Sequence, residues 1–167
     1  YSGAAIMAGA EPVYVPTTEE TGFLPDFLAL PADQLERAAL AYLCSPSNPQ
    51  GAVASLNQLK AYVRLARDLD FILATDECYC EIYCGAPPPG IIEACATDDG
   101  HLRNVIAFHS LSKRSNVPGL RSGFVVGDSD LIMDFARLRQ YTGGASPGPI
   151  LAAATSLWKD EAHVKAN

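Results

Sequence analysis

The chain has 167 residues, of which 49% are hydrophobic and 19% are charged, and its formal net charge is −7. This length and composition are typical of one globular domain with a sizeable core. The acidic excess argues against nucleic acid or an anionic membrane as the main partner, because both would repel the protein, and no apolar run is long enough for a membrane helix.

Apolar runs alternate with helical periodicity along the chain, and this alternation predicts repeated β-α-β units. Five strands are expected, over residues 11–15, 38–44, 71–76, 105–109 and 123–127. Between the second and third strands, Ser55 is placed to cap a helix over 56–69 that has apolar side chains on one face and basic ones on the other. Such a crossover helix implies parallel strands.

The later part of the chain predicts two further helices, one over residues 130–139 and one that begins near Pro149. The Ala-Pro-Pro-Pro-Gly run at 86–90 predicts a rigid surface turn. Strands that are apolar almost throughout are typical of a sheet covered on both faces. The expected fold class is therefore α/β, with three αβα layers around a mostly parallel central sheet.

The two ends and the cysteines bear on the compartment of the protein. The chain begins at Tyr1 with no methionine, basic region or cleavage signal, so we expect no export and a cytoplasmic location. It stops inside an amphipathic pattern at 163–167, which is typical of a piece of a longer protein. The five cysteines predict free thiols, and their spacing does not favour a metal site.

Polar residues gather where three of the expected strands end. In open α/β sheets, ligands bind at the carboxyl ends of the strands, so these residues are the candidate site. They are Asn48 after the second strand, Asp76 and Tyr79 at the third, Ser110, Ser112 and Lys113 after the fourth, and Arg121 before the fifth.

Lys113 is the residue with the most distinctive chemistry. It directly follows a buried strand and lies near Arg114 and Arg121 in the sequence, and both features favour a neutral amine. A neutral, positioned lysine amine is what imine formation with a carbonyl group requires. The alternative is a solvated lysine at a helix end, which would be favoured for a lysine without these neighbours.

The other candidate residues suit the remaining polar parts of one cofactor. Two hydroxyls and a guanidinium, from Ser110, Ser112 and Arg121, are suited to a phosphate group. The Asp76 carboxylate needs a cationic partner such as a protonated pyridine nitrogen. The donors that could face a phenolate oxygen are Asn48 and Tyr79. With an imine-forming lysine, this set describes a site for pyridoxal 5′-phosphate (PLP).

Three motifs resemble the fold type I aminotransferases of class I and II. They are Ser-Pro-Ser-Asn-Pro-Gln-Gly at 45–51, Asp-Glu-Cys-Tyr at 76–79, and Ser-Leu-Ser-Lys at 110–113 with Gly-Leu-Arg-Ser-Gly at 119–123. Their surroundings, at 17–27, 76–83 and 112–124, look like the succinyldiaminopimelate transaminases of bacterial lysine synthesis. The resemblance implies that residues 1–167 are the central part of a PLP-binding large domain, without the N-terminal segment and the C-terminal small domain.

The resemblance also implies roles for the matching residues. Lys113 would bond to the cofactor and carry the substrate proton, Asp76 would keep the ring nitrogen protonated, and Tyr79 would hydrogen-bond the ring oxygen. Asn48 would also hydrogen-bond the ring oxygen and, with Tyr1, would lie near the substrate. The phosphate would be held by Ser110, Ser112 and Arg121. No metal is expected.

The implied reaction moves an amino group between N-succinyl-LL-2,6-diaminopimelate and 2-oxoglutarate, in a homodimer whose partner would contact residues 141–149. The family's glycine-rich phosphate loop, ring-stacking aromatic residue and carboxylate-binding arginine have no match in this chain, so we expect a cofactor-binding core without full activity. The alternatives are another PLP enzyme of this fold, such as a carbon–sulfur lyase, and a non-catalytic PLP-binding sensor domain. A nucleic-acid patch at Lys113, Arg114 and Arg121 is disfavoured by the net charge.

Overall fold

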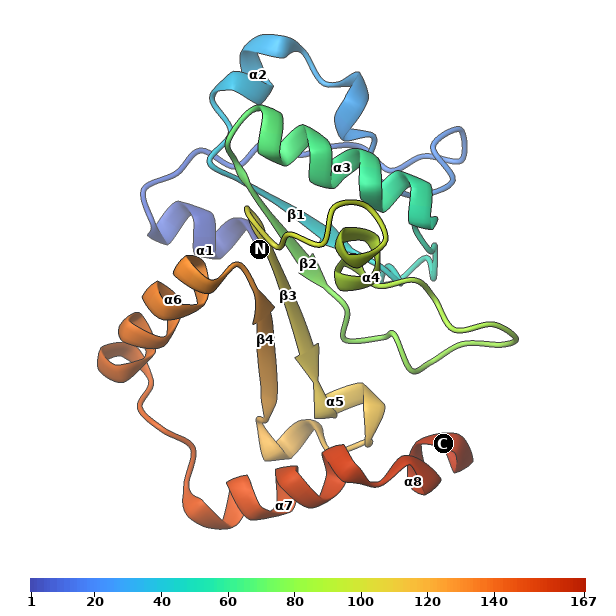
Figure 1. Ribbon diagram of the computed structural model, residues 1–167, viewed down its shortest axis with the longest axis vertical. Coiled ribbons are helices and arrows are strands. Elements are labelled where there is room, and N and C mark those ends of the chain that lie inside the picture. Colours follow the sequence, from blue (N-terminus) through green and yellow to red (C-terminus); the bar gives the residue numbers. More distant parts are fainter.

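The computed structural model describes residues 1–167 and is built on a four-stranded sheet (Figure 1). The strands lie side by side in chain order and are β1 (Leu40–Cys44), β2 (Ile72–Asp76), β3 (Val105–Ser110) and β4 (Gly123–Gly127). β1, β2 and β3 are parallel, whereas β4 pairs with β3 in the antiparallel direction. The prediction of a mostly parallel α/β sheet is confirmed, and the last strand is reversed because only a short connection separates it from β3.

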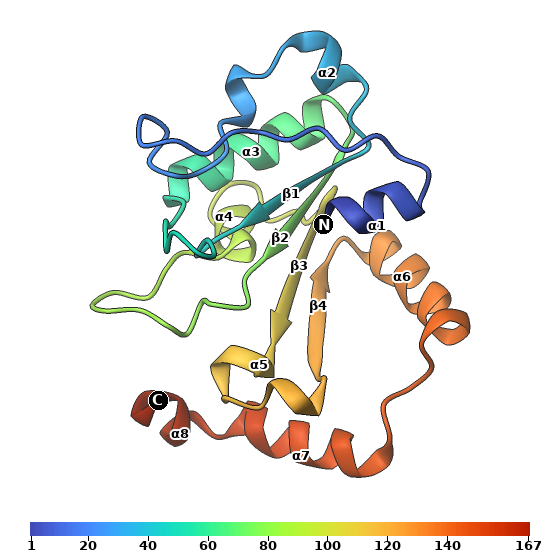
Figure 2. The same ribbon diagram turned by 180° about the vertical axis from the view of Figure 1, so that it is seen from behind.

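Helices lie on both faces of the sheet and beyond its carboxyl-end edge (Figures 1 and 2). They are α1 (Ser2–Met7), η1 (Phe27–Ala29), α2 (Ala32–Glu36), α3 (Leu56–Asp68), α4 (Ile91–Ala96), α5 (Leu111–Arg114), η2 (Pro118–Leu120), α6 (Ser129–Thr142), α7 (Gly148–Lys159) and α8 (Glu161–Ala166). We call α7 and α8 together the C-terminal arm. None of the helices has the length and apolar character needed to cross a membrane.

Helix α3 forms where its capping and its apolar periodicity agree. The Ser55 hydroxyl accepts a hydrogen bond from the Gln58 N–H at 3.3 Å, and the Gln58 side chain accepts one from the Ser55 N–H at 2.9 Å, which completes a capping box. Its buried side chains, which pack on the sheet, are Leu59, Tyr62, Val63 and Ala66. The predicted crossover helix is confirmed and ends one residue earlier than expected.

The two faces of the sheet are covered unequally. Toward α3 and α4, Leu43, Leu73 and Val105 are fully buried. On the opposite face, Leu40 and Tyr42 of β1 remain 41% and 36% exposed. The expectation of a sheet covered on both faces is therefore confirmed for the first face and met only in part on the second, where α1 and α6 form a thinner layer (Figure 2).

The strand predicted over residues 11–15 is wrong. This segment has no regular secondary structure, and Val13 and Tyr14 are exposed. Pro12 lies within it and Pro16 follows it, and because proline has no backbone N–H to donate, the segment is poorly suited to pair with the free edge of β1. Apolar alternation alone therefore predicted one strand too many.

The helical expectations for the last third of the chain are confirmed with shifted bounds. Helix α6 extends beyond the predicted 130–139 at both ends, and α7 begins at Gly148, beside the predicted Pro149. The terminal amphipathic pattern forms α8. The five cysteines are free thiols, as predicted.

Candidate active site

The carboxyl ends of β1, β2 and β3 meet at one edge of the sheet, as the sequence predicted (Figure 1). Asp76, the last residue of β2, pairs with Cys44 of β1 on one side and with Phe108 of β3 on the other, so it lies in the middle of this edge. β3 continues to Ser110, which pairs with Gly123 at the start of β4. The turns that carry the candidate residues therefore adjoin one another.

The Asp76 carboxylate is held by two donors. The Cys78 N–H donates to Oδ1 at 3.1 Å, and the Tyr1 hydroxyl donates to Oδ2 at 2.6 Å. The Tyr1 ring in turn stacks on the Tyr42 ring, with 4.5 Å between their centres. A carboxylate has about four acceptor sites, so Asp76 can still accept a hydrogen bond from a protonated ring nitrogen.

The groups around Asp76 keep their protons at neutral pH. Partial burial, followed by the hydrogen bond to Asp76, raises the pKa of the Tyr1 hydroxyl well above its usual range. Burial, and to a smaller extent the hydrogen bond to Asp76, raise the pKa of the Cys78 thiol to about 12. Burial also raises the pKa of the Cys44 thiol. Tyr1 therefore acts as a hydrogen-bond donor to the carboxylate.

Lys113 is the third residue of α5, the four-residue helix that follows β3. The Ser110 hydroxyl caps this helix, since it accepts from the Ser112 N–H at 3.1 Å and also donates to the Ser112 hydroxyl at 2.9 Å. The Lys113 amine lies 5.6 Å from the centre of the Tyr79 ring. The structure thus brings Lys113 together with Tyr79, and Ser110 together with Ser112.

Arg114 lies elsewhere than the sequence suggested. Its buried guanidinium forms ion pairs with Glu81 and Glu161 and lies over the Trp158 ring. Neighbouring residues of a helix project in directions about 100° apart, so Arg114 faces the C-terminal arm. Its positive charge is therefore paired with two carboxylates, those of Glu81 and Glu161.

Arg121 lies in the turn before β4, where it adopts a left-handed backbone conformation with φ of 52°. Its side chain is exposed and donates to the Pro118 carbonyl at 3.0 Å. The next residue, Ser122, adjoins the serine pair, because its carbonyl accepts from the Leu111 N–H at 3.1 Å and from the Ser110 hydroxyl at 3.5 Å. The backbone that carries Arg121 therefore adjoins Ser110, whereas the Arg121 guanidinium itself points to the Pro118 carbonyl.

Glycine is required where this turn enters β4. A Cβ atom at Gly123 would lie 2.3 Å from the His109 carbonyl oxygen, which no real side chain tolerates. The glycine thus allows β4 to approach β3 directly beside Ser110.

Asn48 lies exposed in the turn after β1. Two serine hydroxyls fix this turn: Ser45 accepts from the Ala54 N–H at 3.0 Å, and Ser47 accepts from the Ala52 N–H at 2.9 Å. Asn48 is therefore presented at the correct edge, with its side chain turned toward solvent.

A buried pair behind the site was missed by the sequence reasoning. The Glu77 carboxylate accepts from the Ile91 N–H at 2.8 Å and the Thr75 hydroxyl at 3.2 Å, and it lies 3.5 Å from the His109 ring nitrogen Nε2. Burial raises its pKa above the usual value for a glutamate. The sequence held one signal of this pair: Glu77 directly follows Asp76. Because neighbouring side chains of a strand point to opposite faces, Glu77 is expected on the face of the sheet opposite to Asp76.

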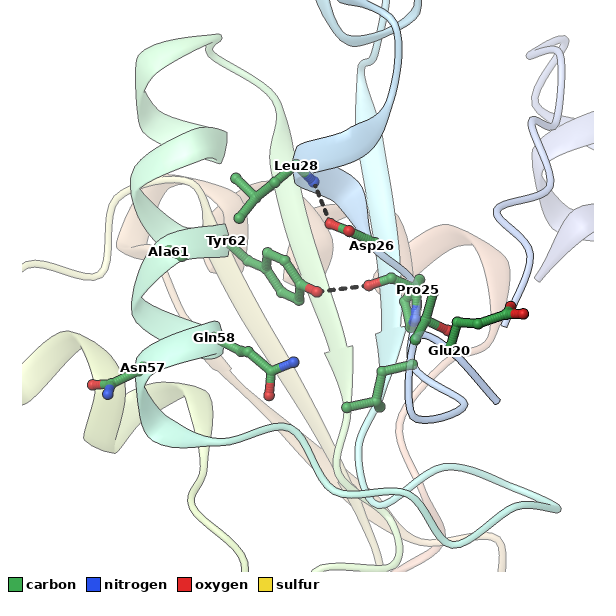
Figure 3. A pocket seen from close by; sticks show the side chains of 10 residues that line it. Glu20, Pro25, Asp26, Leu28, Asn57, Gln58, Ala61 and Tyr62 are labelled. Atoms are coloured by element: carbon green, nitrogen blue, oxygen red, sulfur yellow. Dashed lines mark hydrogen bonds between the residues drawn. The ribbon is translucent and has the colours of Figure 1, made fainter. Parts of the chain in front are cut away.

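The structure also has a cavity of about 460 Å³ away from this edge, between residues 20–28 and α3 (Figure 3). On its wall the Tyr62 hydroxyl donates to the Pro25 carbonyl at 2.6 Å, and the Leu28 N–H donates to Asp26 at 3.1 Å. The first bond attaches residues 20–28 to α3, and the second lies within these residues. None of the predicted site residues lines this cavity, so the candidate site remains at the sheet edge.

The donors at the sheet edge fit the polar parts of PLP. Asp76 offers an acceptor to the ring nitrogen, and Lys113 offers an amine to the aldehyde carbon. The Ser110 and Ser112 hydroxyls offer donors to a phosphate, and Arg121 lies in the turn that adjoins Ser110.

Comparison with known proteins agrees with this assignment. The whole chain, residues 1–167, matches the family described as aminotransferase class I and II. The chain is similar to the crystal structure of the aminotransferase AspB from Helicobacter pylori, with 42% identity and a TM-score of 0.93 over 99% of this chain and 44% of that one. It is also similar to a probable N-succinyldiaminopimelate aminotransferase from Thermus thermophilus, with 26% identity and a TM-score of 0.89 over 99% of this chain and 44% of that one.

Curated relatives match over a limited part of their length. The probable aminotransferase Rv1178 of Mycobacterium tuberculosis is 35% identical over 96% of this chain and 39% of its own. The LL-diaminopimelate aminotransferase of Aquifex aeolicus is 36% identical over 83% of this chain and 35% of its own. The chain therefore spans well under half of each relative. It belongs to the class I and II aminotransferases, a family of PLP-dependent enzymes.

Proposed function

We propose that this chain is the central part of the PLP-binding large domain of an aminotransferase. The enzyme would transfer an amino group between N-succinyl-LL-2,6-diaminopimelate and 2-oxoglutarate. The observation that carries the proposal is the grouping at one sheet edge of the Lys113 amine over the Tyr79 ring, the Asp76 carboxylate held by Tyr1, and the Ser110–Ser112 pair. The names of the diaminopimelate and succinyldiaminopimelate enzymes support the substrate class.

The roles of the protein's residues follow from this arrangement. When bound, PLP supplies an electron-withdrawing ring that eases loss of a proton from the substrate carbon. Asp76 keeps the ring nitrogen protonated, and Tyr1 holds Asp76 in place. Lys113 would hold the cofactor through its Nζ and would move the substrate proton at that same atom.

The remaining residues bind and orient the reacting molecules. The phosphate is held by Ser110, Ser112 and Arg121. Tyr79 and Asn48 hydrogen-bond the ring oxygen, and Tyr1 and Asn48 lie next to the substrate. We further propose a cytoplasmic homodimer in which residues 141–149, a segment that joins α6 to the C-terminal arm, contact the partner subunit.

Borohydride reduction of the full-length protein, followed by peptide mapping, tests the assignment of Lys113. We expect a reduced pyridoxyl group on Lys113 and none in the Lys113→Ala variant. Lys60→Ala is the matched control, because the Lys60 amine lies on α3 and donates to the Thr97 carbonyl at 3.0 Å, away from the site. An adduct on any lysine other than Lys113 would overturn the assignment.

Product analysis separates the proposed reaction from its alternatives. Glutamate formed from 2-oxoglutarate and the diamino substrate supports the aminotransferase. Release of ammonia and pyruvate from a sulfur-containing amino acid would instead identify a carbon–sulfur lyase. Bound PLP without turnover of any amino donor would identify a sensor domain.

A further inference from the structure

We propose that Arg114 is a positioning residue that fixes the Lys113 helix and the Tyr79 turn relative to each other by tying both to the C-terminal arm. This inference rests on the proposed function, because it takes Lys113 to be the lysine that bonds to the cofactor. It concerns a residue that does not touch the reacting groups and acts only through its neighbours.

Each nitrogen of the Arg114 guanidinium has a partner. Nη1 donates to the Leu157 carbonyl near the end of α7 at 2.9 Å, Nη2 forms an ion pair with Glu161 at the start of α8, and Nε lies 3.6 Å from a Glu81 oxygen. The group is only 6% exposed, and its carbon Cζ lies 5.1 Å from the centre of the Trp158 ring. A rigid guanidinium fork in such surroundings fixes direction as well as distance.

These contacts join the C-terminal arm to two segments of the chain that carry site residues. Arg114 adjoins Lys113 in α5, and Glu81 lies two residues after Tyr79 in the turn that follows β2. The contact between Arg114 and Glu81 therefore lies next to the contact between Lys113 and Tyr79, in which the Lys113 amine is 5.6 Å from the centre of the Tyr79 ring. Movement of Arg114 would change the distance between the Lys113 amine and the Tyr79 ring.

A second group of contacts holds the same helix against the arm. The buried Ser115 hydroxyl lies 2.8 Å from the His163 ring nitrogen Nε2, and the Asn167 side chain donates to the Arg114 carbonyl at 3.4 Å. A helix of four residues is not stable by itself, so α5 depends on such contacts for its position. Arg114 supplies the contacts that reach both the arm and the Tyr79 turn.

The test uses the full-length, PLP-loaded enzyme with Arg114→Gln and Arg114→Lys. We expect Arg114→Gln to lower kcat by about 10- to 100-fold, because small misplacements of a reacting group cost about that much. The pH midpoint of the visible absorbance change of the bound cofactor should shift, and amide hydrogen exchange at residues 111–116 should accelerate. Arg114→Lys should restore only part of these properties, since it keeps the charge and loses the fork.

Arg67→Gln is the matched control. The Arg67 side chain is also nearly buried, pairs with Asp99 at 2.8 Å and donates to the Arg103 carbonyl at 3.3 Å, but it lies on α3 away from the site. The Arg67→Gln variant should have a lower free energy of unfolding and an unchanged pH midpoint of the cofactor absorbance. Glu161→Gln, which alters the exposed partner, provides a milder variant that should keep the fold and show the Arg114 effects in weaker form.

The outcomes separate the two proposals. If Arg114→Gln and Glu161→Gln give the titration and exchange of the wild type, Arg114 has no positioning role, whatever Lys113 does. If Arg114→Gln does not fold, Glu161→Gln decides the question alone. If borohydride labels a lysine other than Lys113, the proposed function fails first.

Discussion

Helix α3 and the C-terminal arm are attached to the sheet in different ways. α3 has four fully buried side chains and adds them to the core beneath β1 and β2, whereas α7 has one, Ala154, and α8 has none. The arm is attached by the polar contacts around Arg114 and by an edge contact of the Trp158 ring with the Phe124 ring of β4. Apolar packing therefore sets the strand ends that carry Asp76 and Ser110, while the Lys113 helix combines one buried apolar side chain, Leu111, with polar contacts to the arm.

The largest expected effect lies in the core beneath α3. Phe71, just before β2, is 1% exposed and belongs to this core. Phe71→Ala should lower the free energy of unfolding of the 167-residue chain by about 3–5 kcal/mol, because it removes apolar burial and leaves a cavity. Urea denaturation measures this change. A loss below about 1 kcal/mol would mean that the α3 side is packed no more firmly than the arm.

A smaller, pH-dependent effect on the free energy of unfolding is expected at Glu77, between the core and the arm. Burial raises its pKa in the folded state, so the folded protein binds this proton more tightly than the unfolded chain does. The resulting stability is fully present below the unfolded pKa and is lost as the pH rises through the folded value. As the pH rises above the ordinary glutamate pKa of about 4.3, the stability of Glu77→Gln should therefore fall less than that of the wild type.

Denaturation curves at several pH values measure this difference at Glu77. The exposed Glu36→Gln is the control and should follow the wild type at each pH. Parallel curves for Glu77→Gln and the wild type would show that burial of this carboxylate does not couple stability to pH.

The sequence predicted the parts of the site that depend on local pattern. Strand ends and the residues that follow them are local features, so Asp76, Ser110 and Lys113 were placed at the correct edge. Contacts between distant residues were not predictable in this way: the hydrogen bond between Tyr1 and Asp76 spans 75 positions, and that between Arg114 and Leu157 spans 43. The partners of Arg114 could not be predicted for the same reason, since Leu157 and Glu161 lie in the arm.

A further effect, of about 1 kcal/mol, is expected at the start of α3. Ser55→Ala removes the hydroxyl that accepts from the Gln58 N–H, and the loss of an N-cap typically costs about that much. Thermal or urea denaturation measures it. Ser156→Ala is the control, because its hydroxyl bonds only to the Ala152 carbonyl within α7. Equal losses at the two serines would show that capping of α3 contributes nothing specific.

The smallest effect is expected on the arm itself. Leu151 of α7 is 51% exposed, whereas Leu59 of α3 is 1% exposed, so the same change to serine tests the two attachments directly. Leu151→Ser should alter the free energy of unfolding by no more than about 0.5 kcal/mol, as is usual for surface sites. Leu59→Ser should cost several times more, because it buries a hydroxyl and opens a cavity. Similar losses for both variants would mean that apolar packing also holds the arm. The polar contacts of Arg114 would then not be what distinguishes the attachment of the arm from that of α3.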